Sequence, residues 1–240
     1  ALLYELGVGG GPYGSVYLRG TDGSAAVRLG DGVALSLSRD GRWALARTTG
    51  PHLDVLPTGA GANRRLERPG LTLQGGRWLA DGRVVARARA GQSPSRLYVL
   101  DLDGTATAPI TPENLFVGSS AWGLSPDSTA VAVSTPAGPQ LFPVSGGQGR
   151  ALPGATTTSR VVGWITSGVL VSEDPLGGGL ISRLNPDSGR RDTWADIHPQ
   201  DPAGIMSLDL ALLTTTPDGR SYGYSWHRAT SDLFLVRGWS

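Results

Sequence analysis

A serine followed by a histidine is the first feature of this sequence that could perform nucleophilic chemistry. Ser221 lies in Gly219-Arg-Ser-Tyr-Gly223, which fits the G-x-S-x-G pattern of α/β-hydrolase nucleophiles. That nucleophile needs a strand-to-helix turn, followed by an acid and a histidine. Only 17 residues follow Gly223, their pattern is that of a strand, and the sole later histidine is His227. We therefore interpret Ser221 as a strand residue and predict no catalytic residue.

A glycine-rich segment resembles the phosphate-binding loop of protein kinases. Within Leu6–Tyr17 the glycines follow the G-x-G-x-x-G-x-V spacing. Kinase chemistry also requires a lysine that pairs with the α- and β-phosphates, and all 21 basic residues here are arginine. The segment is therefore interpreted as a loop between two strands, and no cofactor is predicted.

Metal chemistry has few candidate ligands in this chain. Cysteine is absent, which excludes disulfides, thiol nucleophiles and thiolate metal sites. The three histidines, His52, His198 and His227, have no spacing that predicts a shared zinc ion. Asp101-Leu-Asp103-Gly104 resembles the start of a calcium loop, but no acidic residue follows at the twelfth position. A hairpin turn is the favoured interpretation, and no metal site is predicted.

Composition narrows the fold and the partners. Glycine and proline together occupy 53 of 240 positions, which excludes a helical bundle or coiled coil. No stretch approaches the roughly 18 apolar residues that a membrane-spanning helix needs. The net charge is +1, and the densest basic groups are the pairs Arg64-Arg65 and Arg190-Arg191. A nucleic-acid partner is not expected, because such proteins present a basic stripe to the phosphates.

A turn motif recurs along the chain and indicates the elements that carry these residues. It appears as Asp40-Gly41, Asp81-Gly82, Asp127-Ser128 and Asp218-Gly219, with a degenerate copy at Ser167-Gly168. Successive copies lie about 40 to 51 residues apart, and a short apolar or alternating run follows each one, as in Trp43–Ala46 and Ala130–Val133. Such runs beside Asp-Gly predict β-hairpins.

A second repeat follows each of these hairpins. Ser15–Gly23, Arg96–Gly104, Gln140–Gly147 and Leu180–Gly189 each read as a strand that ends in a tight turn. Each unit of about 40 residues therefore contains four short strands, and a helical turn is suggested only at Asp201–Leu210. Repeated four-stranded units predict an all-β fold, a β-propeller of about six blades. The expected blades are 1–31, 32–71, 72–114, 115–155, 156–205 and 206–240, within a single domain.

The two terminal repeats are expected to be incomplete. Leu2–Leu6 aligns with the second strand of a repeat, and Leu233–Val236 aligns with a third strand. The first blade would then lack its inner strand and the last blade its outer strand. We expect a C-terminal fragment of a larger protein, with a weak seam between the terminal repeats.

The repeat resembles that of a known family. Ser125-Pro-Asp127, Thr216-Pro-Asp-Gly219 and Leu97-Tyr-Val-Leu-Asp-Leu-Asp-Gly104 are similar to the TolB-like, WD-repeat-like propeller repeat of bacteria. The resemblance covers Leu2 to Gly238. It implies a propeller of the kind fused behind bacterial Ser/Thr kinase or DNA-binding regulator domains, on the extracytoplasmic side of the membrane. It says little about a ligand.

Three tryptophans are the candidate binding residues. Trp78, Trp122 and Trp164 lie just before the repeat turns, on the strand expected to be innermost. They could pack between blades, or they could form a binding surface at the channel mouth.

The expected function is a non-catalytic module that binds or senses a protein or small ligand at one propeller face. The alternative is a propeller that gates a prolyl-oligopeptidase-like serine hydrolase. A glycosidase with paired carboxylates is less favoured, since only four glutamates are present.

Overall fold

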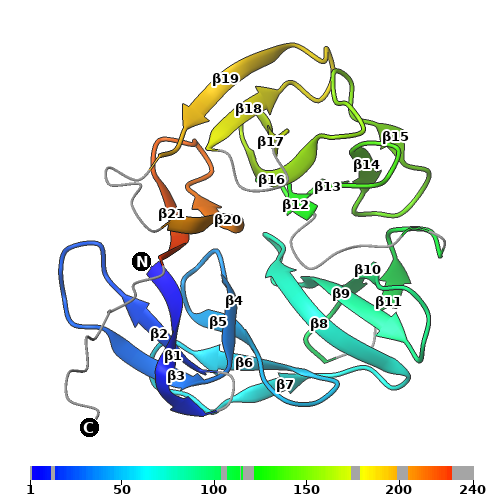
Figure 1. Cartoon of the computed structure of the whole chain (residues 1–240). Helices are drawn as coiled ribbons and strands as arrows, with labels where there is room; N and C mark the ends of the chain where they lie inside the picture. Colours follow the sequence, from blue (N-terminus) through cyan, green and yellow to red (C-terminus); the bar gives the residue numbers. More distant parts are fainter. Residues whose placement is uncertain are drawn as a thin grey trace, which may run out of the picture.

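The protein folds as a ring of antiparallel β-sheets. The computed structural model describes residues 2–11, 14–103, 107–113, 115, 122–173, 179–198 and 205–228, and only the backbone of 2–11, 107–108, 205–212 and 226–228. These residues form 21 strands and no helix. Figure 1 shows successive sheets following one another around the ring. The expected all-β, propeller-like arrangement is confirmed.

Four of the sheets are complete four-stranded blades, whose strands pair in chain order. The second sheet contains β4 (Val33–Leu37), β5 (Trp43–Arg47), β6 (Leu53–Pro57) and β7 (Arg64–Leu66). The third contains β8 (Leu71–Trp78), β9 (Val84–Ala90), β10 (Arg96–Leu100) and β11 (Thr107–Pro109). The fourth contains β12 (Trp122–Leu124), β13 (Ala130–Val133), β14 (Gln140–Pro143) and β15 (Arg150–Ala151). The fifth contains β16 (Arg160–Ile165), β17 (Gly168–Ser172), β18 (Leu180–Leu184) and β19 (Arg191–Asp196).

The two remaining sheets are smaller. The first contains β1 (Leu2–Gly11), β2 (Gly14–Arg19) and β3 (Val27–Asp31), and the sixth contains β20 (Ile205–Thr215) and β21 (Tyr222–Arg228). The expected count of six blades is therefore not supported, because four sheets are complete. Leu233–Val236, the expected third strand of the last repeat, lies outside the described residues.

The suggested helical turn at Asp201–Leu210 is wrong where the structure describes it. Residues 201–204 lie outside the described residues, and Ile205–Leu210 belong to β20. Leu208 pairs with Trp226 of β21, and Asp209 pairs with Ser225. Pairing with a neighbouring strand overrides the local helix propensity of this leucine-rich segment.

Apolar layers between neighbouring sheets form the core. In β13, Val131 and Val133 pack in a cluster with residues of the third sheet, whereas Ala132 packs in a cluster with residues of the fifth. All three side chains are fully buried. Strands covered on both faces read as continuous apolar runs, which explains the run Ala130–Val133. Similar clusters join the first sheet to the second, the second to the third and the fifth to the sixth.

The four aspartate turns connect the first and second strands of the second, third, fourth and sixth sheets. In the fourth sheet, the Ser125 hydroxyl donates to Asp127 and accepts the backbone N–H of Ala130. Asp127 also accepts the backbone N–H of Thr129. Ser38 with Asp40 and Thr216 with Asp218 repeat this arrangement. A short polar side chain at the start of the turn therefore fixes these three hairpins, whereas the Asp81 turn has Leu79 at that position.

Ser128 stands where the other three turns have glycine. Its φ is 63°, similar to the 69°, 88° and 69° of Gly41, Gly82 and Gly219. This left-handed conformation is unfavourable for a residue with a Cβ. In return, the Ser128 hydroxyl accepts the backbone N–H of Ala80 in the third sheet, at 2.9 Å. The strained turn thus contributes a hydrogen bond between two blades.

A cluster around Glu173 joins the loop before β16 to two strands of the fifth sheet. Its carboxylate accepts hydrogen bonds from the side chains of Thr156, Thr158, Ser159 and Arg191. Burial of Glu173 raises its pKa, but the hydrogen bonds of the cluster outweigh this effect and lower the pKa to about 2. The ionised carboxylate therefore stabilises the folded protein.

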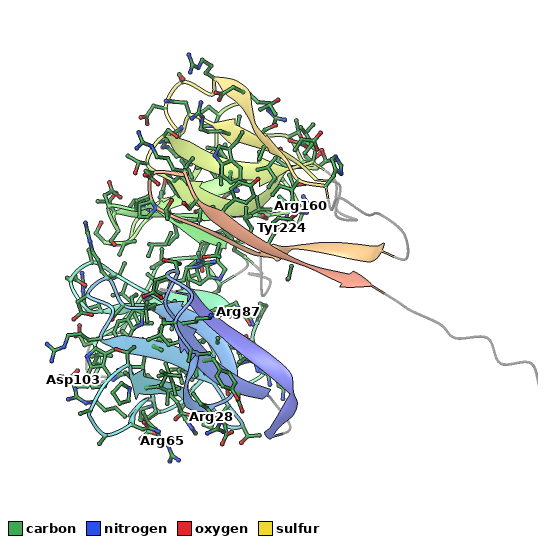
Figure 2. All side chains as sticks on the ribbon, turned by 90° about the vertical axis from the view of Figure 1, so that its left-hand side faces the viewer. Arg28, Arg65, Arg87, Asp103, Arg160 and Tyr224 are labelled. Carbon is green, nitrogen blue, oxygen red and sulfur yellow. The ribbon has the colours of Figure 1, made fainter. Side chains whose placement is uncertain are left out.

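Charged side chains on the outside of the ring are often paired. Arg83 forms an ion pair with Asp81 at 2.7 Å, and Arg96 forms one with Glu113 at 3.2 Å. Figure 2 views the ring from the side and shows the labelled Arg65 and Asp103 side chains at its periphery. Because the carboxylate of each pair is exposed, such pairs contribute little stability each, so the ring depends on its apolar layers.

We predict that Ser128→Ala is less stable than Ser128→Gly by about 1 kcal/mol. Both variants lose the hydrogen bond from Ala80, but only glycine relieves the left-handed backbone. Urea unfolding of the two variants beside the wild type measures this difference. Equal stability of the two variants would contradict the strain at this position.

The Glu173 cluster predicts an acid-dependent loss of stability. Because its folded-state pKa lies below the ordinary value of 4.5, the stabilisation is present above that pH and disappears as the pH falls toward 2. The difference in unfolding free energy between the wild type and Glu173→Gln should therefore be constant near neutral pH and shrink between about pH 4.5 and 2. A difference that does not vary with pH would contradict a depressed pKa.

Candidate functional site

An open cavity lies where the turn ends of five sheets converge. Its volume is about 750 Å³, and the second to sixth sheets all contribute to its wall. We call it the central cavity and define it by Ser36, Leu37, Arg39, Arg77–Ala80, Gly123–Ser128, Val162–Trp164, Thr166, Leu213–Thr215 and Pro217. The inner strands approach closely here: a Cβ on Gly123 would lie 3.2 Å from the carbonyl carbon of Gly163. Glycine at this position keeps β12 and β16 in contact.

The three candidate tryptophans have different environments. Trp78 and Trp122 are 8% and 5% exposed and belong to the apolar clusters on the two sides of the third sheet. Trp164 is half-buried and packs at the edge of the next cluster. Trp78 and Trp164 line the central cavity, whereas Trp122 does not. Core packing therefore accounts for Trp122 and much of Trp78, and Trp164 offers its surface to the cavity.

Arg77 is the cation in the cavity wall that sequence reasoning missed. Its guanidinium lies over the Trp122 ring, 5.1 Å from the ring centroid, and the side chain is half-buried. Burial lowers its pKa, yet a guanidinium stays charged at any physiological pH. Among the described residues, no carboxylate forms an ion pair with Arg77 and no hydrogen bond involves its guanidinium. The charge is thus held by an aromatic face alone.

The sequence could have indicated the position of Arg77 but not its contact. Arg77 directly precedes Trp78 on the strand expected to be innermost, so a position near the channel could be foreseen. Its contact with Trp122 could not, because that residue comes from the neighbouring blade.

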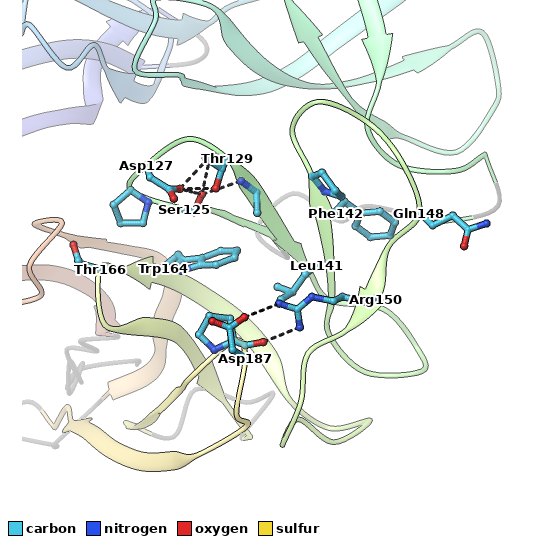
Figure 3. Close-up of a pocket in the computed structure, with 14 residues that line it drawn as sticks. Ser125, Asp127, Thr129, Leu141, Phe142, Gln148, Arg150, Trp164, Thr166 and Asp187 are labelled. Atoms are coloured by element: carbon cyan, nitrogen blue, oxygen red, sulfur yellow. Dashed lines mark hydrogen bonds and ion pairs between the residues drawn. The ribbon is translucent and has the colours of Figure 1, made fainter.

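A second, smaller groove adjoins the central cavity between the fourth and fifth sheets. Its volume is about 540 Å³, and Trp164 lines both spaces. Figure 3 shows the Trp164 ring between the turn that contains Asp127 and the pair formed by Arg150 and Asp187. Arg150 donates to the carbonyl of Pro186 at 2.7 Å and to Asp187 at 3.2 Å. We call this space the side groove; its opposite wall includes Leu141 and Phe142.

The electrostatics of the central cavity combine two cations with one anion. Arg39 and Arg77 line it together with Asp127. The Ser125 hydroxyl, donating to Asp127, holds the pKa of that carboxyl below its ordinary value, with smaller effects from Thr129. Asp127 is thus ionised and occupied by its own turn. The Nε1 donor of Trp78 is buried without a hydrogen-bond acceptor among the described residues. The Arg77 guanidinium and the Trp78 Nε1 are thus two donors of wall residues without an acceptor among the described residues.

The repeat-turn residues surround this face without all entering the cavity. Asp127 lines it, as do the neighbours Arg39, Ala80 and Pro217 of the other three turns. Thr166, beside the degenerate Ser167-Gly168 turn, donates its N–H to the carbonyl of Pro217 at 2.7 Å. We call the surface formed by these repeat turns the turn face, and this hydrogen bond joins its parts in the fifth and sixth sheets.

The motifs interpreted as structural lie in strands and turns. Ser221, interpreted as a strand residue, lies instead in the turn just before β21, where its N–H donates to the Thr216 hydroxyl. The kinase-like glycine segment spans the hairpin of β1 and β2, with residues 12 and 13 outside the described residues. No metal-binding group of three acidic or histidine side chains occurs within the part of the chain that the structure describes. His52 lies 3.6 Å from Asp54 and His198 lies 2.6 Å from Asp196, whereas the His227 side chain is not described.

Comparison with known proteins supports the fold and leaves the function open. No protein-family model matches the sequence, and no curated protein sequence matches it. Among solved structures, the chain is similar to TolB from Acinetobacter baumannii, with a TM-score of 0.65 and 13% identity over 92% of this chain. The chain spans 56% of that TolB chain. The resemblance to the TolB fold is thereby confirmed, and no finding bears on a fused kinase or DNA-binding domain.

Two further similarities come from different kinds of protein. A chain of a nidogen/laminin complex has a TM-score of 0.59 and 14% identity, covering 78% of this chain and 72% of its own. A prolyl endopeptidase has a TM-score of 0.51 and 16% identity, covering 90% of this chain and 35% of its own. At such identities the likeness concerns the fold alone. No helix in the described residues is long and apolar enough to cross a membrane.

Proposed function

We propose that this chain is a non-catalytic binding module that takes an extended protein segment at its turn face. The central cavity and the side groove meet at Trp164, and this junction is the observation that carries the proposal. Their volumes are about 750 and 540 Å³, and lining residues shared at Trp164 make them neighbouring spaces that one extended segment of a partner could occupy. A half-buried indole between two open spaces is a typical hot spot of protein interfaces.

Hydrogen bonds and an ion pair within the walls of the two spaces also favour binding at this face. Hydrogen bonds from Ser125 and Thr129 hold the Asp127 turn, and Arg150 and Asp187 form an ion pair between the fourth and fifth sheets on the other side of the Trp164 ring. A site whose walls are already ordered loses little conformational entropy when a ligand binds. The chain of a nidogen/laminin complex, which shares the fold, gives a precedent for a propeller in a protein complex.

A second candidate is a propeller that gates a serine hydrolase. The prolyl endopeptidase likeness, which covers 90% of this chain, favours it. The natural coding sequence distinguishes the two: a following α/β-hydrolase domain supports gating. A preceding kinase or DNA-binding domain would instead support a binding module in signalling, and a preceding membrane anchor would place that module outside the cytoplasm.

Trp164→Ala tests the binding proposal. Peptides would first be selected on the immobilised wild-type protein from a displayed random library. Their affinity for Trp164→Ala should fall by about thirtyfold, the loss of about 2 kcal/mol typical of an aromatic hot spot. Tyr222→Ala is the matched control, since Tyr222 is 47% exposed and lines neither space. Selected peptides that bind Trp164→Ala as tightly as the wild type would contradict the site.

The absence of catalysis is tested separately. We expect background signal when the protein is incubated with labelled ATP, or with ester and peptide substrates, because Ser221 lies in a turn that leads into a strand. Measurable hydrolysis that disappears in Ser221→Ala would overturn the non-catalytic proposal.

A further inference from the structure

The environment of Arg77 indicates which chemical group a ligand of the turn face presents to this side chain. Other arginines that stack on aromatic rings are different: Arg64 lies over Trp43 near the rim, and Arg96 over Tyr98 while also contacting Glu113. Arg64 is exposed and lines neither the central cavity nor the side groove. Arg77 alone among these three lines the central cavity.

The geometry of the guanidinium leaves its edge available. A guanidinium presents five N–H donors in one plane, and the face of that plane is what an aromatic ring contacts. The contact with the Trp122 ring uses none of these donors in a conventional hydrogen bond, so they can still bind an acceptor. No described residue accepts a hydrogen bond from them, although Arg77 is half-buried. A buried cation without an anion is costly, so a ligand that supplies the anion gains affinity.

We propose that Arg77 binds a carboxylate of the protein segment that occupies the central cavity. This inference rests on the proposed function and adds the chemical group that the site selects. One guanidinium edge matches one carboxylate through two parallel hydrogen bonds. A phosphate dianion would need a second cation beside Arg77. Trp78 and Leu79, which follow Arg77 in the wall, are apolar, and Arg39, the other cation that lines the cavity, is exposed.

The other charged residues that line the central cavity are consistent with one anion-binding site at Arg77. Arg39 is exposed at the rim and adds positive charge. Asp127, also at the rim, is occupied by hydrogen bonds from its own turn. A segment that entered with its carboxylate toward Arg77 would leave its preceding residues against Trp164 and the side groove.

Matched peptides provide the direct test. The probes are N-acetyl-Phe-Gly with a free carboxylate, the same peptide as a C-terminal amide, and N-acetyl-Phe-Glu-amide, whose carboxylate is on a side chain. Binding is followed through the ¹⁵N–¹H signals of the arginine Nε groups, with the Arg77 signal assigned by its loss in Arg77→Gln. At least one carboxylate peptide should shift that signal and bind about tenfold or more tightly than the amide. The better of the two carboxylates identifies the source of the anion.

Variants separate this inference from the proposed function. Arg77→Gln should reduce the preference for carboxylate over amide to about onefold. Arg42→Gln, which removes an equally charged but exposed side chain outside the cavity, should preserve the preference. Equal binding of the carboxylate and amide peptides by the wild type, with both weakened in Trp164→Ala, would overturn the role of Arg77 and leave the proposed function intact. Failure of every peptide to bind at millimolar concentration would overturn both.

Inorganic phosphate is the competing anion that completes the experiment. If phosphate shifts the Arg77 signal at a lower concentration than either carboxylate peptide, the assignment to a carboxylate is wrong. The comparison of matched peptides on the wild type needs no variant, so it decides the question even if Arg77→Gln does not fold.

Discussion

The apolar layer between neighbouring sheets is the interaction on which the rest of this structure depends. A four-stranded antiparallel sheet has two faces, and in this ring the middle strands bury both, as Val131 and Ala132 show on opposite sides of β13. Each complete blade therefore needs a neighbour on each side for its stability, as in other repeat architectures. Individual polar side chains add to this stability. The Ser128 hydroxyl forms a hydrogen bond to the neighbouring blade, and Glu173 forms a cluster of charge-assisted hydrogen bonds.

The same stacking creates the candidate site. Inner strands from five sheets converge, and side chains that are distant in sequence meet at the central cavity. Arg77 comes from the third sheet and Trp122 from the fourth, so their contact exists only when two blades pack in register. Trp164 from the fifth sheet then lies where the cavity meets the side groove. Assembly of the site and stability of the ring are thus consequences of one packing arrangement.

Local features of the sequence predicted the elements well. Asp-Gly turns and apolar runs are short-range signals, so the hairpins at Asp40, Asp81, Asp127 and Asp218 could be anticipated, as could the all-β class. The segment from Ile205 to Leu210 could not, because its strand pairing with β21 overrides a leucine-rich local pattern. The number of complete blades depends on pairing between distant strands. Arg77 was missed for the same reason, since its stacking partner belongs to another repeat, whereas Trp164 was found because its position repeats.

Packing between two blades holds the Arg77 guanidinium ready for a carboxylate in the central cavity. A crystal structure of the full chain with the tighter-binding of the two carboxylate peptides, N-acetyl-Phe-Gly or N-acetyl-Phe-Glu-amide, tests this claim most directly. We expect the peptide carboxylate within about 3 Å of the Arg77 guanidinium, with the Trp122 ring still stacked on its face. A peptide bound at the turn face with its carboxylate in solvent, or bound at another surface of the ring, would contradict the claim.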